Sequence, residues 1–186
     1  MLTKRFDDAF CLASELHREQ RRKGTRIPYI SHLMAVAANV IEHGGDENQA
    51  IAALLHDAAE DQGGRPTLEL IEQRFGADVA EIVSDCTDAW TEPKPPSRQR
   101  KEAYLAHLPS VSSRSLLVSL ADKAHNVRAI LLDHRTMGSK IWYRFNASRE
   151  ETLWYYDALR TFYQRTLPGP LSREFTETVD QLENCV

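Results

Sequence analysis

The chain has 186 residues, so we expect one domain over residues 1–186, large enough to bury its own core. Its formal net charge of −4 gives no electrostatic reason to expect nucleic-acid binding, and no apolar run reaches the roughly 18 residues of a membrane span. Its 3 cysteines are scattered and odd in number, which argues against a disulfide framework or a cysteine zinc site and favours a reducing, cytoplasmic location.

The first predicted element is an amphipathic helix from Lys4 to about Arg21, because apolar residues recur there at helical spacing. Gly24 and Pro28 then end the helix and force a loop. Four cations fall in this segment: Arg21, Arg22, Lys23 and Arg26. The loop is either a solvated basic segment or a phosphate clamp built from arginine forks and a lysine.

The second predicted helix runs from His32 to about Glu42, with Ser31 as its N-cap. It places an imidazole in the first helical turn. Asp46 then caps a third helix that we expect to continue to Asp61.

The third helix carries the densest polar motif of the chain, over residues 54–61. His56 and Glu60 are four residues apart, as are Asp57 and Asp61, so each pair shares a helix face. The apolar sequence just upstream predicts a buried helix, in which ionisable groups are costly unless a partner such as a metal ion compensates them. The simpler alternative is a solvated acidic helix end with an ordinary histidine.

Further helices are predicted along the rest of the chain, and we find no convincing strand, so the sequence predicts an all-α bundle. Proline-rich residues 90–97 form the longest expected loop. The predicted elements are a short helix capped by Thr67 and ended by Gly76, helices at 78–88 and 98–107, a long helix opened by Ser112 or Ser113, an aromatic-rich helix at about 140–164, and a last helix after Pro168-Gly169-Pro170.

The long helix supplies a further candidate ligand, Asp122. His32, His56, Asp57 and Asp122 together make a mixed nitrogen and oxygen set. With one or two waters this set gives five or six ligands, which suits Mn²⁺ or Fe²⁺ better than a sulfur-rich structural zinc site.

The neighbouring polar residues favour hydrolysis of a phosphoester or pyrophosphate ester. Glu60 or Asp61 could orient a water or take its proton, and the Asn126 amide could hold a water or a ribose hydroxyl. Arg22 and Lys23 could neutralise phosphate charge. Lys94, Arg98 and Arg144 are additional candidates for that role.

The aromatic residues and the remaining histidines are the other side chains to interpret. The aromatic residues of segment 140–164 are typical of a core, although part of the stripe could stack on a nucleobase. Four histidines are expected to lie on the surface or in the core without chemistry: His17, His43, His107 and His134. His125 stays undecided, because it adjoins Asn126 but is turned roughly 100° from it on the helix.

Three motifs, in this order, resemble a known family. They are residues 21–32 with the basic loop and His32, residues 53–61 around His56-Asp57, and residues 120–128 around Asp122. The pattern is similar to that of the HD superfamily of metal-dependent phosphohydrolases, and closest to the hydrolase domain of the RelA/SpoT enzymes and the small alarmone hydrolases. The resemblance covers most of residues 5–165. The chain departs from it at Gln62, where threonine is usual, and in the aromatic segment.

The resemblance implies an HD-type helical bundle in which the four candidate ligands hold Mn²⁺. It also implies that Glu60 and Asp61 activate water, that Asn126 lies near the substrate ribose, and that the substrate is a guanosine or adenosine alarmone such as (p)ppGpp, which loses its 3′-pyrophosphate. An alarmone synthetase is not expected. Two alternatives stay open: an HD phosphohydrolase for another nucleotide, such as a deoxynucleotide or NADPH, and a non-catalytic nucleotide sensor. A homo-oligomer is compatible with the sequence, but no surface patch requires one.

Overall fold

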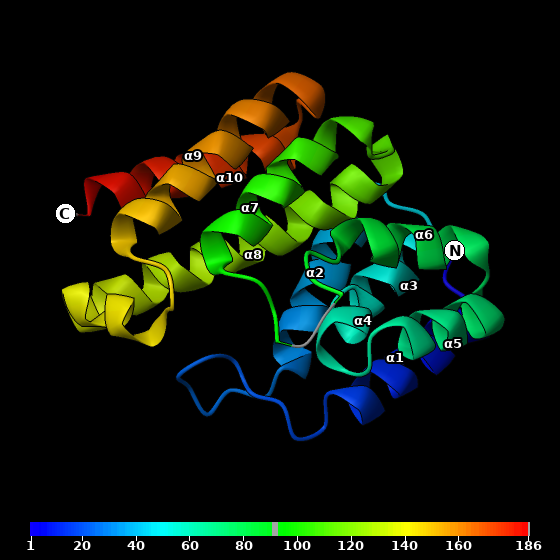
Figure 1. The fold of residues 1–186 in the computed structure, drawn as a ribbon. Coiled ribbons are helices and arrows are strands. Elements are labelled where there is room, and N and C mark those ends of the chain that lie inside the picture. The colour runs from blue at the N-terminus through cyan, green and yellow to red at the C-terminus, as the bar shows by residue number, and fades with distance from the viewer. Residues whose placement is uncertain (91–92, 186) are drawn as a thin grey trace.

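The computed structural model describes residues 1–90 and 93–185, and every regular element in these ranges is a helix (Figure 1). This confirms the predicted all-α class. Residues 91 and 92 of the expected loop lie outside the described ranges. The α-helices are α1 (Lys4–Leu16), α2 (Ile30–Glu42), α3 (Glu47–Leu55), α4 (Ala58–Asp61), α5 (Arg65–Phe75), α6 (Ala77–Cys86), α7 (Ser97–His107), α8 (Ser113–Met137), α9 (Arg149–Thr166) and α10 (Pro170–Asn184), and two 3₁₀ helices are η1 (Leu108–Ser110) and η2 (Gly138–Arg144).

Helix α8 connects the two halves of the molecule. It packs against α2, α3 and α6 on one side and against α10 on the other. Figure 1 shows α9 and α10 together at one side of α8, and α1 with α3 to α6 at the other. Fully buried apolar side chains from both halves, such as Leu55, Leu120 and Phe175, form a continuous hydrophobic core. The side chains of α8 that face this core are therefore held rigidly.

Two of the predicted helix caps are confirmed. The Asp46 carboxylate accepts from the Gln49 backbone N–H at 2.9 Å, and the Gln49 side chain returns a bond to the Asp46 N–H at 3.0 Å. The Ser112 hydroxyl accepts from the Ser115 N–H at the start of α8. Each such cap contributes about 1 kcal/mol by satisfying backbone donors at the helix start.

The other two predicted caps are wrong. Helix α2 already begins at Ile30, and the backbone N–H of Ser31 donates to Pro28 O, so Ser31 lies inside the helix. Thr67 lies inside α5, where its hydroxyl donates to Gln62 O, and Gly64 occupies the N-cap. In both cases the preceding turn starts the helix earlier than the side-chain signal predicts.

The first helix ends at Leu16 rather than at Arg21, and the chain then forms a loop closed by a backbone bridge between Arg21 and Pro28. Tyr29 N–H donates to Gln20 O at 3.0 Å within this pairing. The predicted helix is therefore too long at its C-terminal end, where the chain pairs across the loop instead.

The aromatic segment is also not one helix. Residues 138–144 form η2, and α9 begins only at Arg149, after a capping box made by Ser148 and Glu151. None of the helices in the described part of the chain is long and apolar enough to cross a membrane.

Candidate metal centre

The predicted third helix is interrupted at the central motif. Helix α3 ends at Leu55 and α4 begins at Ala58, so His56 and Asp57 lie in the turn between two helices. In one continuous helix these adjacent residues would point about 100° apart. The turn instead brings His56 Nε2 to 3.0 Å from Asp57 Oδ2. The interruption therefore lets two neighbouring residues face the same point.

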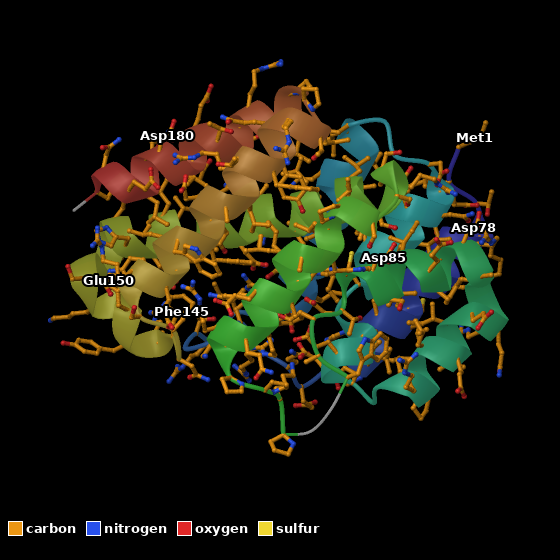
Figure 2. All side chains as sticks on the ribbon, turned by 45° about the horizontal axis from the view of Figure 1, so that its top comes forward. Met1, Asp78, Asp85, Phe145, Glu150 and Asp180 are labelled. Carbon is orange, nitrogen blue, oxygen red and sulfur yellow. The ribbon has the colours of Figure 1, made fainter. Side chains whose placement is uncertain are left out.

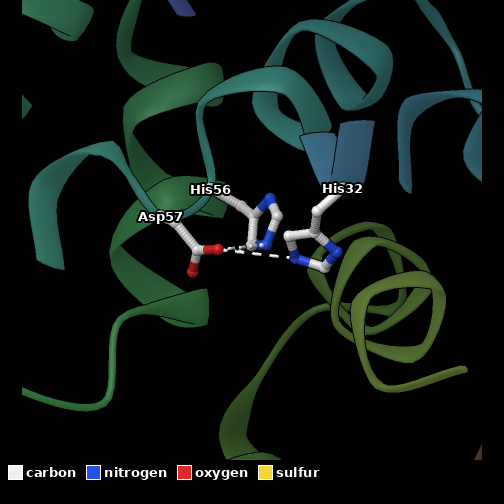
Figure 3. Close-up of side chains that lie close together, drawn as sticks. All are labelled: His32, His56 and Asp57. Atoms are coloured by element: carbon white, nitrogen blue, oxygen red, sulfur yellow. Dashed lines mark ion pairs between the residues drawn. The ribbon is translucent and has the colours of Figure 1, made fainter. Parts of the chain in front are cut away.

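The structure brings all four predicted ligands together. His32 from α2 and Asp122 from α8 join the turn, with His32 Nε2 at 3.5 Å from Asp57 Oδ2 and at 3.2 Å from Asp122 Oδ1. His56 Nε2 lies 3.6 Å from Asp122 Oδ1. Figure 3 shows His32, His56 and Asp57, whose potential ligand atoms all lie within 4.8 Å of one another. Three separate parts of the chain thus converge on one point.

The chemistry of this cluster fits a divalent cation. His56 donates its Nδ1–H to Ala53 O at 2.8 Å, so the neutral form of this ring has its lone pair on Nε2, where a cation can replace the proton. The Nε2 atoms of His32 and His56 are buried and have no hydrogen-bond partner in the described part of the chain. Buried polar atoms are normally satisfied, and two lone pairs facing two carboxylates repel one another unless a cation lies between them. The nitrogen and oxygen donors suit a transition metal ion.

Both carboxylates are held in the ionised form. Without a bound cation, the charges of Asp57 and Asp122 outweigh burial and raise the pKa of His56 well above its usual range. Burial disfavours ionisation of Asp57, but the positive charge of protonated His56, together with the hydrogen bonds from His32 and His56, holds the pKa of its carboxyl well below the usual range. Burial also opposes ionisation of Asp122, and the Lys123 ammonium, 2.6 Å from Asp122 Oδ2, outweighs it and lowers the pKa. The Tyr29 hydroxyl donates to Asp57 Oδ2 at 2.6 Å and fixes its orientation.

The predicted acidic pair lies next to this cluster and is bridged by Lys94. Its ammonium is 2.9 Å from Glu60 Oε1 and 2.8 Å from Asp61 Oδ1. Burial, followed by the charges of Asp88 and Asp57, raises the pKa of Glu60 to about 7. A carboxylate with a pKa near neutrality is suited to accept a proton. Lys94 was predicted only as a phosphate ligand, and no local sequence signal pairs it with residues more than thirty positions away.

We expect the variant Lys94→Met to shift the acid limb of the pH–rate profile to higher pH. The Lys94 ammonium lowers the pKa of Glu60, so its removal keeps the Glu60 carboxyl protonated, and unable to accept a proton, up to a higher pH. The measurement is kcat/KM against pH, with the exposed Lys4→Met as control. An unchanged acid limb would show that Glu60 ionisation does not govern the rate.

A cavity of about 540 Å³ opens beside the cluster, between the basic loop and α8. Its volume is typical of a small-molecule site. Arg22 crosses it and donates to Asn126 Oδ1 at 2.6 Å, and Asn126 donates to Asp122 Oδ1 at 2.5 Å. This bond chain ties the basic loop to the candidate ligands. The lining includes Arg22, Lys23, Asp61, His125, Asn126, Ile27, Leu132, Phe145 and Tyr156.

The remaining predicted cations lie in different surroundings. Lys23 lines the cavity and donates to Asn146 Oδ1 at 3.2 Å. The Arg144 side chain packs over Gly24 so closely that it leaves no room for a Cβ there, and Gly24 has a φ of +68°, which favours glycine. Arg144 also pairs with Asp133 at 2.7 Å. Arg98 stacks over the Trp154 ring and pairs with Glu102 at 2.6 Å. Substrate contacts by these residues stay predictions, and Lys23 is the best placed of them.

Sequence reasoning missed two residues close to the cluster. Gln20 donates to Asp61 Oδ2 at 2.9 Å. His17, predicted to lack chemistry, is buried, stacks on Tyr29 and has its Nδ1 at 2.5 Å from Gln20 Oε1. His125, which the sequence left undecided, lies with its Nδ1 at 2.8 Å from His32 Nδ1. The contacts of Gln20 with Asp61 and of His125 with His32 join residues from separate elements, so helical spacing carries no signal for them.

Comparison with known proteins agrees with this geometry. A family model described as HD domain matches residues 9–153. The chain is 43% identical over 124 residues to guanosine-3′,5′-bis(diphosphate) 3′-pyrophosphohydrolase MESH1 of Xenopus tropicalis, a match that covers 65% of this chain and 66% of that protein. The human MESH1 is 39% identical, again over 65% of this chain and 66% of the relative. The matched region thus spans just under two thirds of these relatives.

A longer relative and a solved structure extend the comparison. The bifunctional (p)ppGpp synthase/hydrolase SpoT of Escherichia coli is 35% identical over 133 residues, which cover 68% of this chain but 18% of SpoT. A solved structure of a metazoan orthologue of SpoT that hydrolyses ppGpp superposes with a TM-score of 0.78 at 26% identity and covers 97% of both chains. Since the HD model matches well over half of the sequence and the converged residues lie within it, the chain belongs to the HD domain family.

Proposed function

We propose that this protein is a divalent-cation-dependent phosphohydrolase that removes the 3′-pyrophosphate of guanosine or adenosine alarmones such as (p)ppGpp. One observation carries the proposal: the His32, His56, Asp57 and Asp122 cluster lies beside the Lys94-bridged acidic pair and a cavity with a basic wall. The relatives named as (p)ppGpp hydrolases support this choice of substrate.

Each residue has a distinct task in the proposed reaction. His32, His56, Asp57 and Asp122 would hold a divalent ion, Mn²⁺ by our assignment, and that ion would supply charge stabilisation to the phosphoryl group and a lowered pKa to a bound water. Glu60, with its pKa raised to about 7, accepts a proton from the attacking water. The water oxygen forms the new bond to phosphorus, the bond from phosphorus to the ribose 3′-oxygen breaks, and that oxygen leaves with a proton from solvent as the 3′-hydroxyl. Asp61 orients the attacking water. Asn126 holds a ribose hydroxyl or a second water. Arg22 and Lys23 neutralise phosphate charge, with Arg144 supporting the loop that carries them.

We expect Arg22→Ala to raise KM for a phosphorylated nucleotide by about 10-fold or more, because a hydrogen bond to a charged group contributes roughly 1.5–3 kcal/mol. The substitution also removes the bond from Arg22 to Asn126. Steady-state kinetics provide the measurement. Arg26→Ala is the matched control, because Arg26 is exposed on the same loop. An unchanged KM in Arg22→Ala would contradict the clamp.

The deciding experiment incubates the protein with Mn²⁺ and a panel of guanosine and adenosine alarmones, deoxynucleotides and NADPH. Release of pyrophosphate from an alarmone, abolished by a chelator, is the expected result. Phosphate release from NADPH or a deoxynucleotide alone would instead favour an HD phosphohydrolase with another substrate. Tight nucleotide binding without turnover would identify a sensor and refute catalysis.

We also infer that residues 1–186 act as one domain. Helix α8 packs against elements from both halves, and the core residues form one cluster. A single cooperative unfolding transition is the expected signature. Light scattering in solution would test whether the domain assembles into a homo-oligomer.

A further inference from the structure

His125 contacts a predicted metal ligand from the side opposite the carboxylates. Its Nδ1 lies 2.8 Å from His32 Nδ1, and the ring centroids are 4.8 Å apart. His125 also lines the cavity that contains Asn126. It therefore stands between the metal cluster and the space we assign to the nucleotide.

The separation of the two nitrogens requires one proton between them, because two N–H groups would repel and two lone pairs would gain nothing. If His125 donated this proton, neutral His32 would carry its own proton on Nε2, facing Asp57 and Asp122. That tautomer cannot bind a cation at Nε2. Metal binding therefore requires that His32 donate and that His125 Nδ1 accept.

The same reasoning determines the protonation of the other ring nitrogen of His125, Nε2. A neutral imidazole with a lone pair on Nδ1 has its proton on Nε2. This Nε2 has no hydrogen-bond partner among residues 1–90 and 93–185. His125 lines the cavity, so this N–H is available to an oxygen of a ligand bound there.

We infer that His125 is a positioning residue: it holds His32 in the tautomer and orientation that bind the cation, and it offers its Nε2–H to an oxygen of the nucleotide. The inference rests on the proposed metal site. For His56, the backbone carbonyl of Ala53 has the corresponding role, because it accepts a hydrogen bond from Nδ1 at 2.8 Å. The two candidate histidine ligands thus differ, because only His32 is oriented by a side chain that also faces the cavity.

Two variants separate the two tasks of His125. His125→Phe keeps a ring but removes the acceptor, and we expect its affinity for Mn²⁺ to fall about 10–100-fold, the usual effect of losing the partner of a ligating histidine. His125→Asn places an amide oxygen near the Nδ1 position but removes the Nε2–H. It should keep most of the Mn²⁺ affinity and raise KM for the nucleotide, with kcat changed less.

Calorimetric titration of Mn²⁺ into metal-stripped protein provides a readout that does not depend on turnover. His134→Phe, a partly exposed histidine on the same helix α8, is the matched control and should bind Mn²⁺ like the wild type. Long-range ¹H–¹⁵N spectra of the Zn²⁺-loaded wild type should show the His32 proton on Nδ1. This measurement uses the wild type, so it tests the inference even if His125→Phe does not fold.

Wild-type Mn²⁺ affinity in folded His125→Phe, or a His32 proton on Nε2 in the loaded protein, would overturn the inference. A wild-type protein that binds no divalent ion would refute the proposed metal site and this inference together. A wild type that binds Mn²⁺ but hydrolyses no alarmone would refute the proposed substrate only, and the calorimetric comparison would still decide the role of His125.

Discussion

Asp57→Ala is expected to abolish Mn²⁺ binding and turnover together. The Asp57 carboxylate faces both histidine Nε2 atoms, at 3.0 Å from His56 and 3.5 Å from His32, so its loss removes an anionic ligand at the centre of the cluster. Metal-ion stabilisation of phosphoryl transfer is worth several kcal/mol, and each 1.4 kcal/mol is tenfold in rate. We therefore expect kcat/KM to fall on the order of 10³-fold or more.

Metal content after dialysis and steady-state kinetics measure the two effects. Asp57→Asn keeps the side-chain shape and an acceptor for the Tyr29 hydroxyl, so it separates the loss of charge from any loss of folding. Asp78→Ala is the matched control, because Figure 2 shows Asp78 at the opposite end of the molecule from Phe145, which lines the cavity. Manganese retained at wild-type level in Asp57→Ala would contradict the ligand assignment.

Glu60→Gln is expected to retain the metal and lose rate. Glu60 lies beside the candidate ligands but is paired with Lys94, and the amide keeps the side-chain volume while it cannot accept the proton. General-base catalysis contributes about 10²–10⁴-fold, and we expect kcat to fall within this range with KM changed little. A change of this type reflects an interaction made in the transition state.

The control for Glu60→Gln is Glu102→Gln, a half-exposed glutamate paired with Arg98 on α7, which should behave like the wild type. Mn²⁺ titration shows whether the metal site is intact. If kcat of Glu60→Gln stayed near wild type, Asp61 would be the remaining candidate for the base, and Asp61→Asn would then be expected to show the loss.

Local chemistry determined a large part of this protein. Apolar spacing, caps and helix breakers predicted a helix in each segment where the described part of the chain has an α-helix, although α3 and α4 were predicted as one helix, and the short oxygen side chains of Asp46 and Ser112 marked two helix starts. The metal ligands were also predictable as residue types, because imidazole and carboxylate groups in otherwise apolar helices need a compensating partner. These signals depend only on neighbours within about four residues.

The tertiary structure alone decided how the side chains meet. The turn at His56 and Asp57, the Lys94 bridge between Glu60 and Asp61, and the contact of His125 with His32 all depend on packing between distant segments. Helical spacing describes which residues share a face of one helix, but it contains no information about which faces of different helices approach. The sequence by itself therefore determined which groups the site contains, and the packing of α2, α3 and α8 decided their geometry, because burial of the shared core sets the relative positions of the three helices.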